Sequence, residues 1–412
     1  EQDSWGGVDT HLLELLSTWP SSEDRFVLMV NEGNAGFERL RAHFEALPHV
    51  RCVSVPSSSH NELNSRWRKR PLLSRLSRGL HLLLPLTDWL SARQLRRHFA
   101  REGRFDLLLG NNGGYPGARG TLCALEAGAR AGIAVRLLLV HHTATAPGPF
   151  MGWYECLVDR KISRIATALV CVSWATRATL LARRWVDDEA LRIRVIHHRI
   201  TLDARGPEAG VFDIRSAAKA APGELVIGIA GRVEPYKGHE DLIFALARMS
   251  LQHRARIRLV VIGSGAEDEL QRLNRLAAGL GIGDRVHFLG YVSGRAADLI
   301  AQLDLLAMAT RSFEGFGLTL AEAMAVGTPV LATRVGAIPE FIDENIGALI
   351  NPGAPDEIAR ALADFVDRPD AWAHRAALAL DRIETKAGSM ADDYRQLFVE
   401  CLADSRRDER IV

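Results

Sequence analysis

Short apolar runs alternate with amphipathic stretches along the chain, a pattern typical of α/β proteins with parallel sheets. Helix-like stretches such as GVDTHLLELLSTW (7–19) and GTLCALEAGARAG (120–132) separate the runs of the first half. This half is therefore expected to form one doubly wound domain over residues 1–200. Its six strand-like runs are RFVLMV (25–30), RCVSV (51–55), FDLLLG (105–110), VRLLLV (135–140), ALVCV (168–172) and IRVI (193–196).

The pattern pauses after residue 200 and restarts at residue 225. Residues 201–224 have no sustained period and carry Gly, Pro and Ala, which predicts an interdomain linker. We expect a second doubly wound domain over 225–385, and a final helix in 386–412 that can cross back to the first domain. The six runs of the second half are LVIGIAG (225–231), IRLVVIG (257–263), RVHFLG (285–290), DLLAMAT (304–310), PVLAT (329–333) and GALIN (347–351).

Composition narrows the class of protein. A chain of 412 residues, 47% hydrophobic and 25% charged, is long enough for two globular domains. Its net charge of +1 argues against a general binder of polyanions. The five cysteines are scattered without a CxxC pair, which argues against a disulfide framework or a structural zinc site and fits a reducing cytosol. No apolar run is long enough to span a membrane.

Two loops that follow strands of the second half carry candidate chemistry. In GRVEPYKG (231–238), Arg232 and Lys237 supply positive charge beside a strand end, as two phosphates require. In FEGFGLTLAEAMAVG (313–327), glycines precede a strong helix former, so free backbone N–H groups suit a diphosphate. The simpler interpretation of both cations is a solvated surface. GSGAEDE (263–269) is an incomplete dinucleotide fingerprint, because Asp268 stands at its last glycine position.

Two carboxylates flank the glycines of the second loop. Glu322 is expected about one helical turn inside the helix, where it can accept hydrogen bonds from hydroxyl groups. Glu314 is expected at the mouth, beside the phosphates. A carboxylate is unfavourable there unless it binds sugar hydroxyls or faces a developing positive charge, and we expect sugar hydroxyls to be its partner.

Residues 225–366 resemble the nucleotide-sugar domain of retaining glycosyltransferases of family 4, which have the GT-B fold. The shared motifs appear in order: GRVEPYKG, EGFGLTLAE, EAMAVGTPVLAT, GAIPEFI and GALINPGAPDEIARAL. The resemblance implies two Rossmann-like domains facing a cleft. It also implies that Arg232 and Lys237 bind the donor diphosphate, that Glu314 contacts the donor sugar, and that Glu322 holds the ribose. Further donor contacts are implied for the backbone of Phe316, Gly317 and Leu318, and for Tyr291 and Val292 beside the base.

The first half resembles the family less closely. Gly6 and Gly7 match a Gly-Gly turn that approaches the donor, but only five residues precede Gly6, and we expect the strand before this turn to be missing. His141 and His142 follow a strand, where the family has a histidine at the donor sugar; His141 is favoured. Neighbouring strand residues point to opposite faces, so these two are not expected to share a metal. In VIHHRITLD, His198 and Arg199 replace the Asn and Gly of relatives.

Residues 66–104 are locally basic. They contain eleven Lys and Arg against Asp88 and Glu102, a net charge of +9, interleaved with tryptophans and leucines. Such a stretch can lie on an anionic membrane surface. The alternative is an Arg-rich acceptor groove, or solvated helices packed on the sheet. Nucleic acid is not expected, because the chain lacks a base-reading motif.

The resemblance predicts an enzyme: a retaining, metal-independent transferase moving a hexosyl unit from a UDP- or GDP-sugar to a glycan or lipid-linked acceptor. No cofactor or essential metal is expected, because the chain has no Asp-x-Asp. The expected setting is bacterial envelope polysaccharide synthesis, in the cytoplasm or at the inner face of the plasma membrane. Two alternatives stay open: an inactive binding partner of another transferase, and a nucleotide-sugar 2-epimerase.

Overall fold

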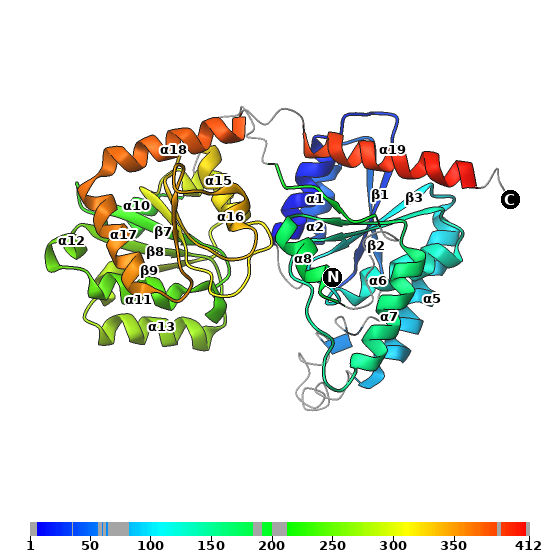
Figure 1. The fold of residues 1–412 in the computed structure, drawn as a ribbon, viewed down its shortest axis with the longest axis horizontal. Helices are drawn as coiled ribbons and strands as arrows, with labels where there is room; N and C mark the ends of the chain where they lie inside the picture. The colour runs from blue at the N-terminus through cyan, green and yellow to red at the C-terminus, as the bar shows by residue number, and fades with distance from the viewer. Residues whose placement is uncertain are drawn as a thin grey trace. The chain divides into compact units, whose positions relative to one another are not determined.

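The computed structural model describes residues 6–34, 36–56, 60, 63–64, 82–183, 192–199, 212–384 and 389–408. The contacts between residues divide the chain into two compact units (Figure 1). Unit 1 comprises Glu1–His198 and Gly388–Val412, and unit 2 comprises Arg199–Ala387. The chain therefore leaves unit 1 once and returns to it.

Unit 2 is built on one six-stranded parallel sheet. Its strand order is β12-β11-β10-β7-β8-β9, so successive strands are added outward from the β7–β10 pair in opposite directions. The strand order thus reverses between β7 and β10, which makes that pair the topological switch point of the sheet. The strands are β7 (Leu225–Ala230), β8 (Ile257–Ile262), β9 (Val286–Gly290), β10 (Leu305–Met308), β11 (Val330–Thr333) and β12 (Ala348–Ile350).

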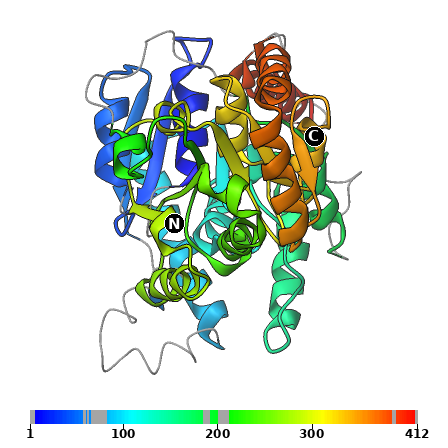
Figure 2. The same cartoon turned by 90° about the vertical axis from the view of Figure 1, so that its left-hand side faces the viewer.

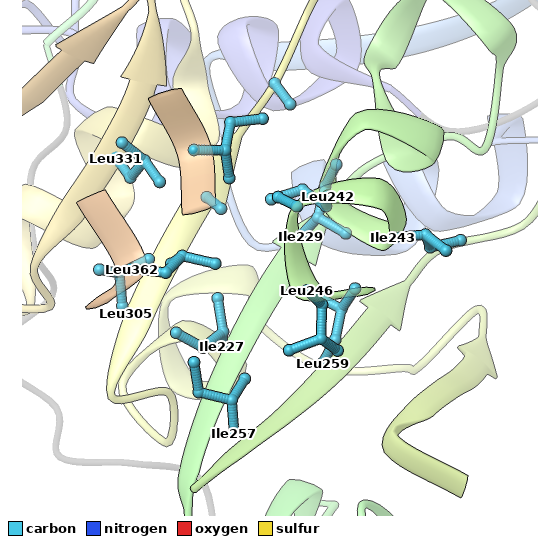
Figure 3. Close-up of a cluster of buried hydrophobic side chains, with 14 of the residues drawn as sticks. Ile227, Ile229, Leu242, Ile243, Leu246, Ile257, Leu259, Leu305, Leu331 and Leu362 are labelled. Atoms are coloured by element: carbon cyan, nitrogen blue, oxygen red, sulfur yellow. The ribbon is translucent and has the colours of Figure 1, made fainter. Parts of the chain in front are cut away.

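Apolar side chains cover both faces of this sheet, as expected where strands are buried on both sides. Ile227 and Ile229 of β7 point to one face, where they pack with α11, α13 and α17 (Figure 3). Val226, which directly precedes Ile227, packs on the opposite face with α14, α15, α16 and α18. On the first face α11 and α17 contact each other, and Figure 2 shows them side by side.

Helices α11 to α16 of unit 2 connect consecutive strands, whereas α10 precedes β7 and α17 and α18 follow β12. Each fully buried Leu or Ile in them contributes about 1.5–3 kcal/mol to stability. Their bounds are α10 (Ile214–Ala217), α11 (His239–Arg248), α12 (Leu251–Ala255), α13 (Glu267–Gly279), α14 (Ala296–Ile300), α15 (Leu318–Ala325), α16 (Ile338–Phe341), α17 (Pro355–Asp367) and α18 (Pro369–Glu384), with short 3-10 turns at η2 (Pro235–Lys237) and η3 (Gly283–Arg285).

The segment expected as a linker is partly structured. Residues 212–224 contain α10, and both Ile214 and Ala218 are fully buried in the core of unit 2. Asp213 caps this short helix by accepting a hydrogen bond from the backbone N–H of Ser216 at 3.0 Å. A helix of one turn has too few residues to show a hydrophobic period, so the pattern of apolar residues does not predict α10. Residues 201–211 lie outside the described part of the chain.

Unit 1 contains two parallel sheets among its described residues. One pairs β1 (Phe26–Asn31) with β2 (Val50–Val55), and the other has the order β3-β4-β5-β6. The strands of the second sheet are β3 (Leu107–Asn112), β4 (Val135–Val140), β5 (Ala168–Cys171) and β6 (Arg194–Val195). The helices are α1 (Gly7–Ser17), α2 (Phe37–Phe44), α5 (Leu84–Glu102), α6 (Arg119–Arg130), α7 (Gly152–Ile165), α8 (Trp174–Leu181) and α19 (Met390–Asp408).

The terminal helix α19 belongs to unit 1 although it follows unit 2 in the chain. It contacts α1 and β4, and its Tyr394 is fully buried with the ring against His11, at 5.6 Å between ring centroids. Phe398 packs on Trp19 from the segment after α1. The helix therefore closes part of the core of unit 1.

Candidate functional site

The candidate site of unit 2 lies at the carboxyl ends of β7 and β10. These two strands are hydrogen-bonded neighbours at the switch point, so the loops that follow them leave the same edge of the sheet side by side. The first loop contains Arg232 and Lys237, and the second contains Glu314. Lys237 and Glu314 are 77 residues apart in the chain, and the topology brings them together.

Lys237 and Glu314 form an ion pair across the two loops. The ammonium Nζ lies 2.7 Å from Glu314 Oε2, and both side chains are largely buried. Lys237 is therefore a partner of the Glu314 carboxylate that the sequence did not predict. Contact of Glu314 with sugar hydroxyls stays a prediction. An ammonium group has three donors, so Lys237 can hold Glu314 and still donate to a phosphate.

Gly238 makes the close approach of the two loops feasible. Its φ is 75°, in the left-handed region that glycine adopts without strain. A Cβ atom on this residue would stand 1.9 Å from the carbonyl oxygen of Ala309, at the start of the second loop. The close approach of Lys237 and Glu314 therefore depends on a residue without a side chain.

Arg311 fastens the second loop to the first turn. Its guanidinium donates to both carboxylate oxygens of Asp241, at 2.7 and 2.6 Å, and to Glu240 at 3.1 Å. Its backbone N–H donates to the carbonyl of Tyr236 at 2.7 Å. Such a bidentate pair fixes orientation as well as distance, so Arg311 positions Lys237 opposite Glu314.

The amino end of α15 opens onto the same edge. Gly317 is the N-cap, with φ 91°, and it has no side chain that could accept from the first helical amides. Leu318, the first helical residue, is half-buried, and Phe316 is buried and stacked on Phe341 at 5.0 Å. Backbone N–H groups at a helix start attract anions, as the sequence predicts for this loop.

Glu322 sits one turn inside α15 and is half-buried. Burial raises the pKa of its carboxyl from 4.5 to about 7, with no neighbouring charge contributing within the described residues. A carboxyl with such a raised pKa gains if a ligand supplies hydroxyl donors, because they stabilise the ionised form. The pKa of His239, beside Lys237, is lowered to about 4. Burial is the main cause, and the positive charge of Lys237 is the second.

The other predicted donor residues of unit 2 are more exposed. Arg232 pairs with Glu234 at 3.0 Å, and more than half of its side chain is exposed. Tyr291 follows the edge strand β9 and is 61% exposed, so it is not part of the core. Val292 is half-buried against the second face of the sheet. The roles of these three residues stay predictions.

In unit 1, the Gly6–Gly7 turn begins α1. The backbone N–H of Gly6 donates to Asp9 Oδ2 at 2.9 Å, so a carboxylate of the chain itself occupies this helix start. Burial raises the pKa of Asp9. A carboxylate here opposes a phosphate, so the predicted donor contact of Gly6 and Gly7 has an electrostatic competitor.

The two adjacent histidines have different environments. His142 is half-buried, whereas His141 is buried and lies in a cluster with His11 and His198, which we call the histidine cluster. One ring nitrogen from each of these three lies within 4.8 Å of the others. His11 Nδ1 and His198 Nδ1 are 2.7 Å apart, and His141 Nε2 lies 2.6 Å from Asn111 Oδ1.

Sequence reasoning missed this cluster. His11 is on α1, His141 follows β4 and His198 follows β6, so no local spacing links them. In the sequence, His198 stands out only because it replaces the Asn of relatives in VIHHRITLD. Burial is the first cause that lowers the pKa of each ring, to about 3 for His198, so all three are neutral near pH 7. The one available signal was the polar His11, the fifth residue of α1, on the buried side of that helix.

The basic stretch is described only from residue 82 onward, and residues 65–81 lie outside the described part. From there α5 carries exposed arginines at its carboxyl half and exposed apolar residues at its amino end. Asp88 of α5 accepts hydrogen bonds from Arg119 of α6 and from Tyr154 of α7, the latter at 2.9 Å. Within the described residues, every helix is too short or too polar to cross a bilayer.

Residues 211–379 match the family described as "Glycosyl transferases group 1". This span contains the β7 and β10 loops, Lys237, Glu314 and all of α15. This part of the chain is therefore similar to that glycosyltransferase family. The match covers unit 2 and leaves most of unit 1 outside.

Curated relatives extend the similarity without covering whole chains. A D-inositol 3-phosphate glycosyltransferase of Streptomyces scabiei is 34% identical over 253 residues, which cover 57% of this chain and 55% of the relative. An MMP alpha-(1->4)-mannosyltransferase of Mycolicibacterium hassiacum is 30% identical, covering 53% and 50%. The chain thus spans about half the length of the curated relatives it matches.

Solved glycosyltransferase structures share the fold of the whole chain. Anabaena HepE in complex with UDP has a TM-score of 0.73 at 20% identity and covers 98% of both chains. Sucrose-phosphate synthase of Thermosynechococcus elongatus has a TM-score of 0.66 at 18% identity, covering 92% of this chain and 100% of that one. The predicted GT-B fold, with two Rossmann-like domains, is confirmed.

Proposed function

We propose that this chain is a glycosyltransferase that moves a hexosyl unit from a UDP- or GDP-sugar to a glycan or lipid-linked acceptor, with retention at the anomeric carbon. The observation that carries the proposal is the meeting of Lys237, Glu314 and the amino end of α15 at the switch point of unit 2. A cation, helix amides and two carboxylates together suit a ligand with a diphosphate between two hydroxyl-rich groups.

Each group has a part in this proposal. Lys237, Arg232 and the α15 amides hold the diphosphate, and Glu322 accepts from the ribose hydroxyls. Glu314 accepts from the donor sugar. The bond from the anomeric carbon to the diphosphate oxygen breaks, and the leaving diphosphate takes the electron pair. The acceptor oxygen bonds to the same face of the sugar, and its proton passes to the diphosphate. Charge on the leaving group is stabilised by Lys237 and its neighbours.

The names of relatives guide the choice of donor. HepE was crystallised with UDP and with UDP-glucose, and two relatives are named for inositol phosphate and for mannosyl transfer. These names support testing UDP-hexoses first and GDP-mannose second. A glycan or lipid of the cell envelope is proposed as the acceptor, on the motif resemblance of residues 225–366 alone.

The first test is donor binding by thermal shift. A ligand that binds only the folded state raises the melting temperature with its concentration. UDP or GDP is expected to raise it for the wild type, and Lys237→Ala is expected to weaken the affinity at least tenfold. Lys161→Ala is the matched control, because it removes a lysine of α7 that pairs with Glu126 of α6. Unchanged nucleotide affinity in both Lys237→Ala and Arg232→Ala would refute the diphosphate role.

A second test separates an enzyme from an inactive binding partner. The purified chain is incubated with each donor, with and without acceptor, and release of the nucleoside diphosphate is measured. Turnover is expected with one donor. Binding without any hydrolysis or transfer, for every donor and acceptor tried, favours the partner protein instead.

We further propose that transfer needs no divalent cation, because Lys237 and Arg232 supply the positive charge at the diphosphate. Activity is expected to survive excess EDTA. Complete loss in EDTA that Mn²⁺ or Mg²⁺ restores would show that a metal, rather than these side chains, neutralises the phosphates.

We also propose that unit 1 docks on an anionic membrane. Helices α5 and α7 belong to unit 1 (Figure 1), and Tyr154 of α7 donates a hydrogen bond to Asp88 of α5. Exposed apolar side chains lie at the amino ends of both helices. Arg93 lies over the ring of Trp89 at 5.4 Å, and further exposed arginines follow along α5. Such a pairing of an apolar face with cations suits anionic headgroups. The apolar face comprises Leu82, Leu83, Leu86, Trp89, Phe150, Trp153 and Leu157.

Co-sedimentation with lipid vesicles tests this docking. Binding to phosphatidylglycerol vesicles is expected to exceed binding to phosphatidylcholine vesicles and to fall with salt. Trp153→Ser combined with Leu86→Ser is expected to weaken it at least tenfold. Trp174→Ser, an exposed tryptophan on α8 outside the apolar face, is the matched control. Equal sedimentation of all three proteins would refute the assignment.

A further inference from the structure

The histidine cluster of unit 1 brings three possible metal ligands together within the described residues. We propose that His11, His141 and His198 bind one divalent first-row transition ion, with Zn²⁺ as the reference ion. The three rings come from α1, from the end of β4 and from the segment after β6, and all are buried. One nitrogen from each lies within 4.8 Å of the other two.

The chemistry of the donor set fits such an ion. Imidazole nitrogens suit Zn²⁺, Cu²⁺ and Ni²⁺, and three of them leave one tetrahedral position open. Burial holds all three rings neutral, as metal ligands must be. Magnesium and calcium, which prefer oxygen ligands, are disfavoured by the same donor set.

Asn111 completes the arrangement around His141. Its side-chain oxygen lies 2.6 Å from His141 Nε2 and can only accept, so Nε2 carries the proton and Nδ1 keeps its lone pair. Metal-bound histidines commonly donate their second ring N–H to an oxygen in this way. His141 is thereby fixed in the tautomer that a metal at Nδ1 requires.

The rings must shift to meet one ion, because the His141 and His198 rings are stacked at an interplanar angle of 20° and the three nitrogens span up to 4.8 Å. His11 Nδ1 and His198 Nδ1 are 2.7 Å apart and share one proton in a hydrogen bond. Two nitrogens on one tetrahedral Zn²⁺ stand about 3.3 Å apart, given Zn–N bonds of about 2.0–2.1 Å. The rings would therefore separate by about half an ångström. The shared proton would pass to the Nε2 atom of one of these rings. The Nε2 atom of His11 has no hydrogen-bond partner within the described residues.

An ion at this place would tie three segments of unit 1 together. His198 is the last residue of unit 1 before the chain enters unit 2, so the ion would fix the point where the chain leaves. The ion is proposed as structural and takes no part in transfer. With His141 in the cluster, His142 is the histidine of the pair that remains for the sugar donor.

The test is a titration of tag-free, metal-stripped full-length protein with Co²⁺. Tetrahedral Co²⁺ with nitrogen ligands absorbs visible light strongly, and one equivalent is expected to bind and to be displaced by Zn²⁺. His198→Asn and His11→Asn are each expected to lower Co²⁺ affinity at least tenfold. His197→Ala changes the neighbouring half-buried histidine and is the matched control that should keep full affinity.

Two further measurements keep the outcome decisive. Far-UV circular dichroism, and the thermal shift caused by UDP or GDP, report whether each Asn variant still folds. No cobalt absorption in the wild type would overturn the proposal. Equal cobalt binding by the wild type and both Asn variants would also overturn it, because the ion would then sit elsewhere. Neither result bears on nucleotide binding, so the proposed transferase function is tested separately.

Discussion

Both concentrations of functional groups lie where parallel strands end, yet they solve opposite electrostatic problems. In unit 2, Lys237 and Glu314 are ionised and neutralise each other, and the neighbouring Arg232 is largely exposed. In unit 1, the histidine cluster is buried, neutral and without a carboxylate among its own members. The first arrangement keeps charge ready for an anion. The second keeps lone pairs ready for a cation.

The largest effect on nucleotide binding is expected from adding a side chain at Gly238. Gly238→Ala would place a Cβ atom against the Ala309 carbonyl, so the Lys237 turn should unfold locally and nucleotide binding should be lost. Gly353→Ala is the control: its φ of 68° is similar, but its Cβ would meet nothing within 4 Å. The control should lose only about 1–2 kcal/mol of stability. Chemical denaturation and nucleotide titration of both variants measure the difference, and equal losses would exclude the steric cause.

The next effect concerns the ion pair itself. Glu314→Gln should lower the transfer rate about a hundredfold, the size of effect seen when one electrostatic contact to a transition state is removed. Affinity for bare UDP or GDP should stay the same or rise, because Lys237 loses its competing carboxylate. Rates of transfer and nucleotide affinities are measured side by side. A wild-type transfer rate in Glu314→Gln would leave the carboxylate only a structural role.

The pH dependence of nucleotide binding should show a smaller effect at Glu322. Its folded pKa of about 7 means that the carboxyl ionises between about pH 6 and pH 8. Because ribose hydroxyls donate to the ionised form, affinity should rise severalfold over that range. Glu322→Gln should abolish the rise and weaken binding at high pH. An identical rise in the variant would assign the titration to another group.

Glu322 and the histidine cluster should also shift stability in opposite directions with pH. The pKa of Glu322 is raised from 4.5, so its contribution to unit 2 is lost as pH climbs from about 4.5 through about 7. His198 is lowered from 6.5 to about 3, so its contribution to unit 1 is lost as pH falls from about 6.5 towards 3.

The smallest effect is expected on the stability of unit 1 at acid pH. His198→Asn removes one group that takes up a proton on unfolding, so the slope of unfolding free energy against pH should fall by at most about 1.4 kcal/mol per pH unit. Hydrogen exchange of unit 1 peptides between pH 4 and pH 6 measures that slope. An unchanged slope would mean that the ring is not held neutral by the fold.

Most of the fold could be predicted because strands in parallel sheets are continuous apolar runs. The expected strand at 135–140 matches β4 (Val135–Val140), and the expected 225–231 matches β7 (Leu225–Ala230) within one residue. The one-turn helix α10 could not be predicted, because burial of Ile214 depends on distant residues such as Gln302, which bonds the backbone N–H of Ile214 at 3.0 Å.

The site of unit 2 could be predicted from the sequence because its groups lie in short motifs on two loops. The partnership of Lys237 with Glu314 could not, since it depends on which strands are neighbours. For the same reason the histidine cluster could not be predicted. Its members are separated by 130 and 57 positions in the chain, and only packing of α1 against the strand ends joins them.

The return of α19 to unit 1 sets an order of events during synthesis. Residues 199–387 of unit 2 leave the ribosome as one continuous segment and can fold as soon as they emerge. Unit 1 must wait, because Tyr394, Ala391 and Cys401 fill its interior and are made after unit 2. Until then the rings of Trp19 and His11 lack the helix that covers them. Unit 1 begins before unit 2 in the chain but is completed after it, and its nascent form exposes apolar surface to which a chaperone can bind.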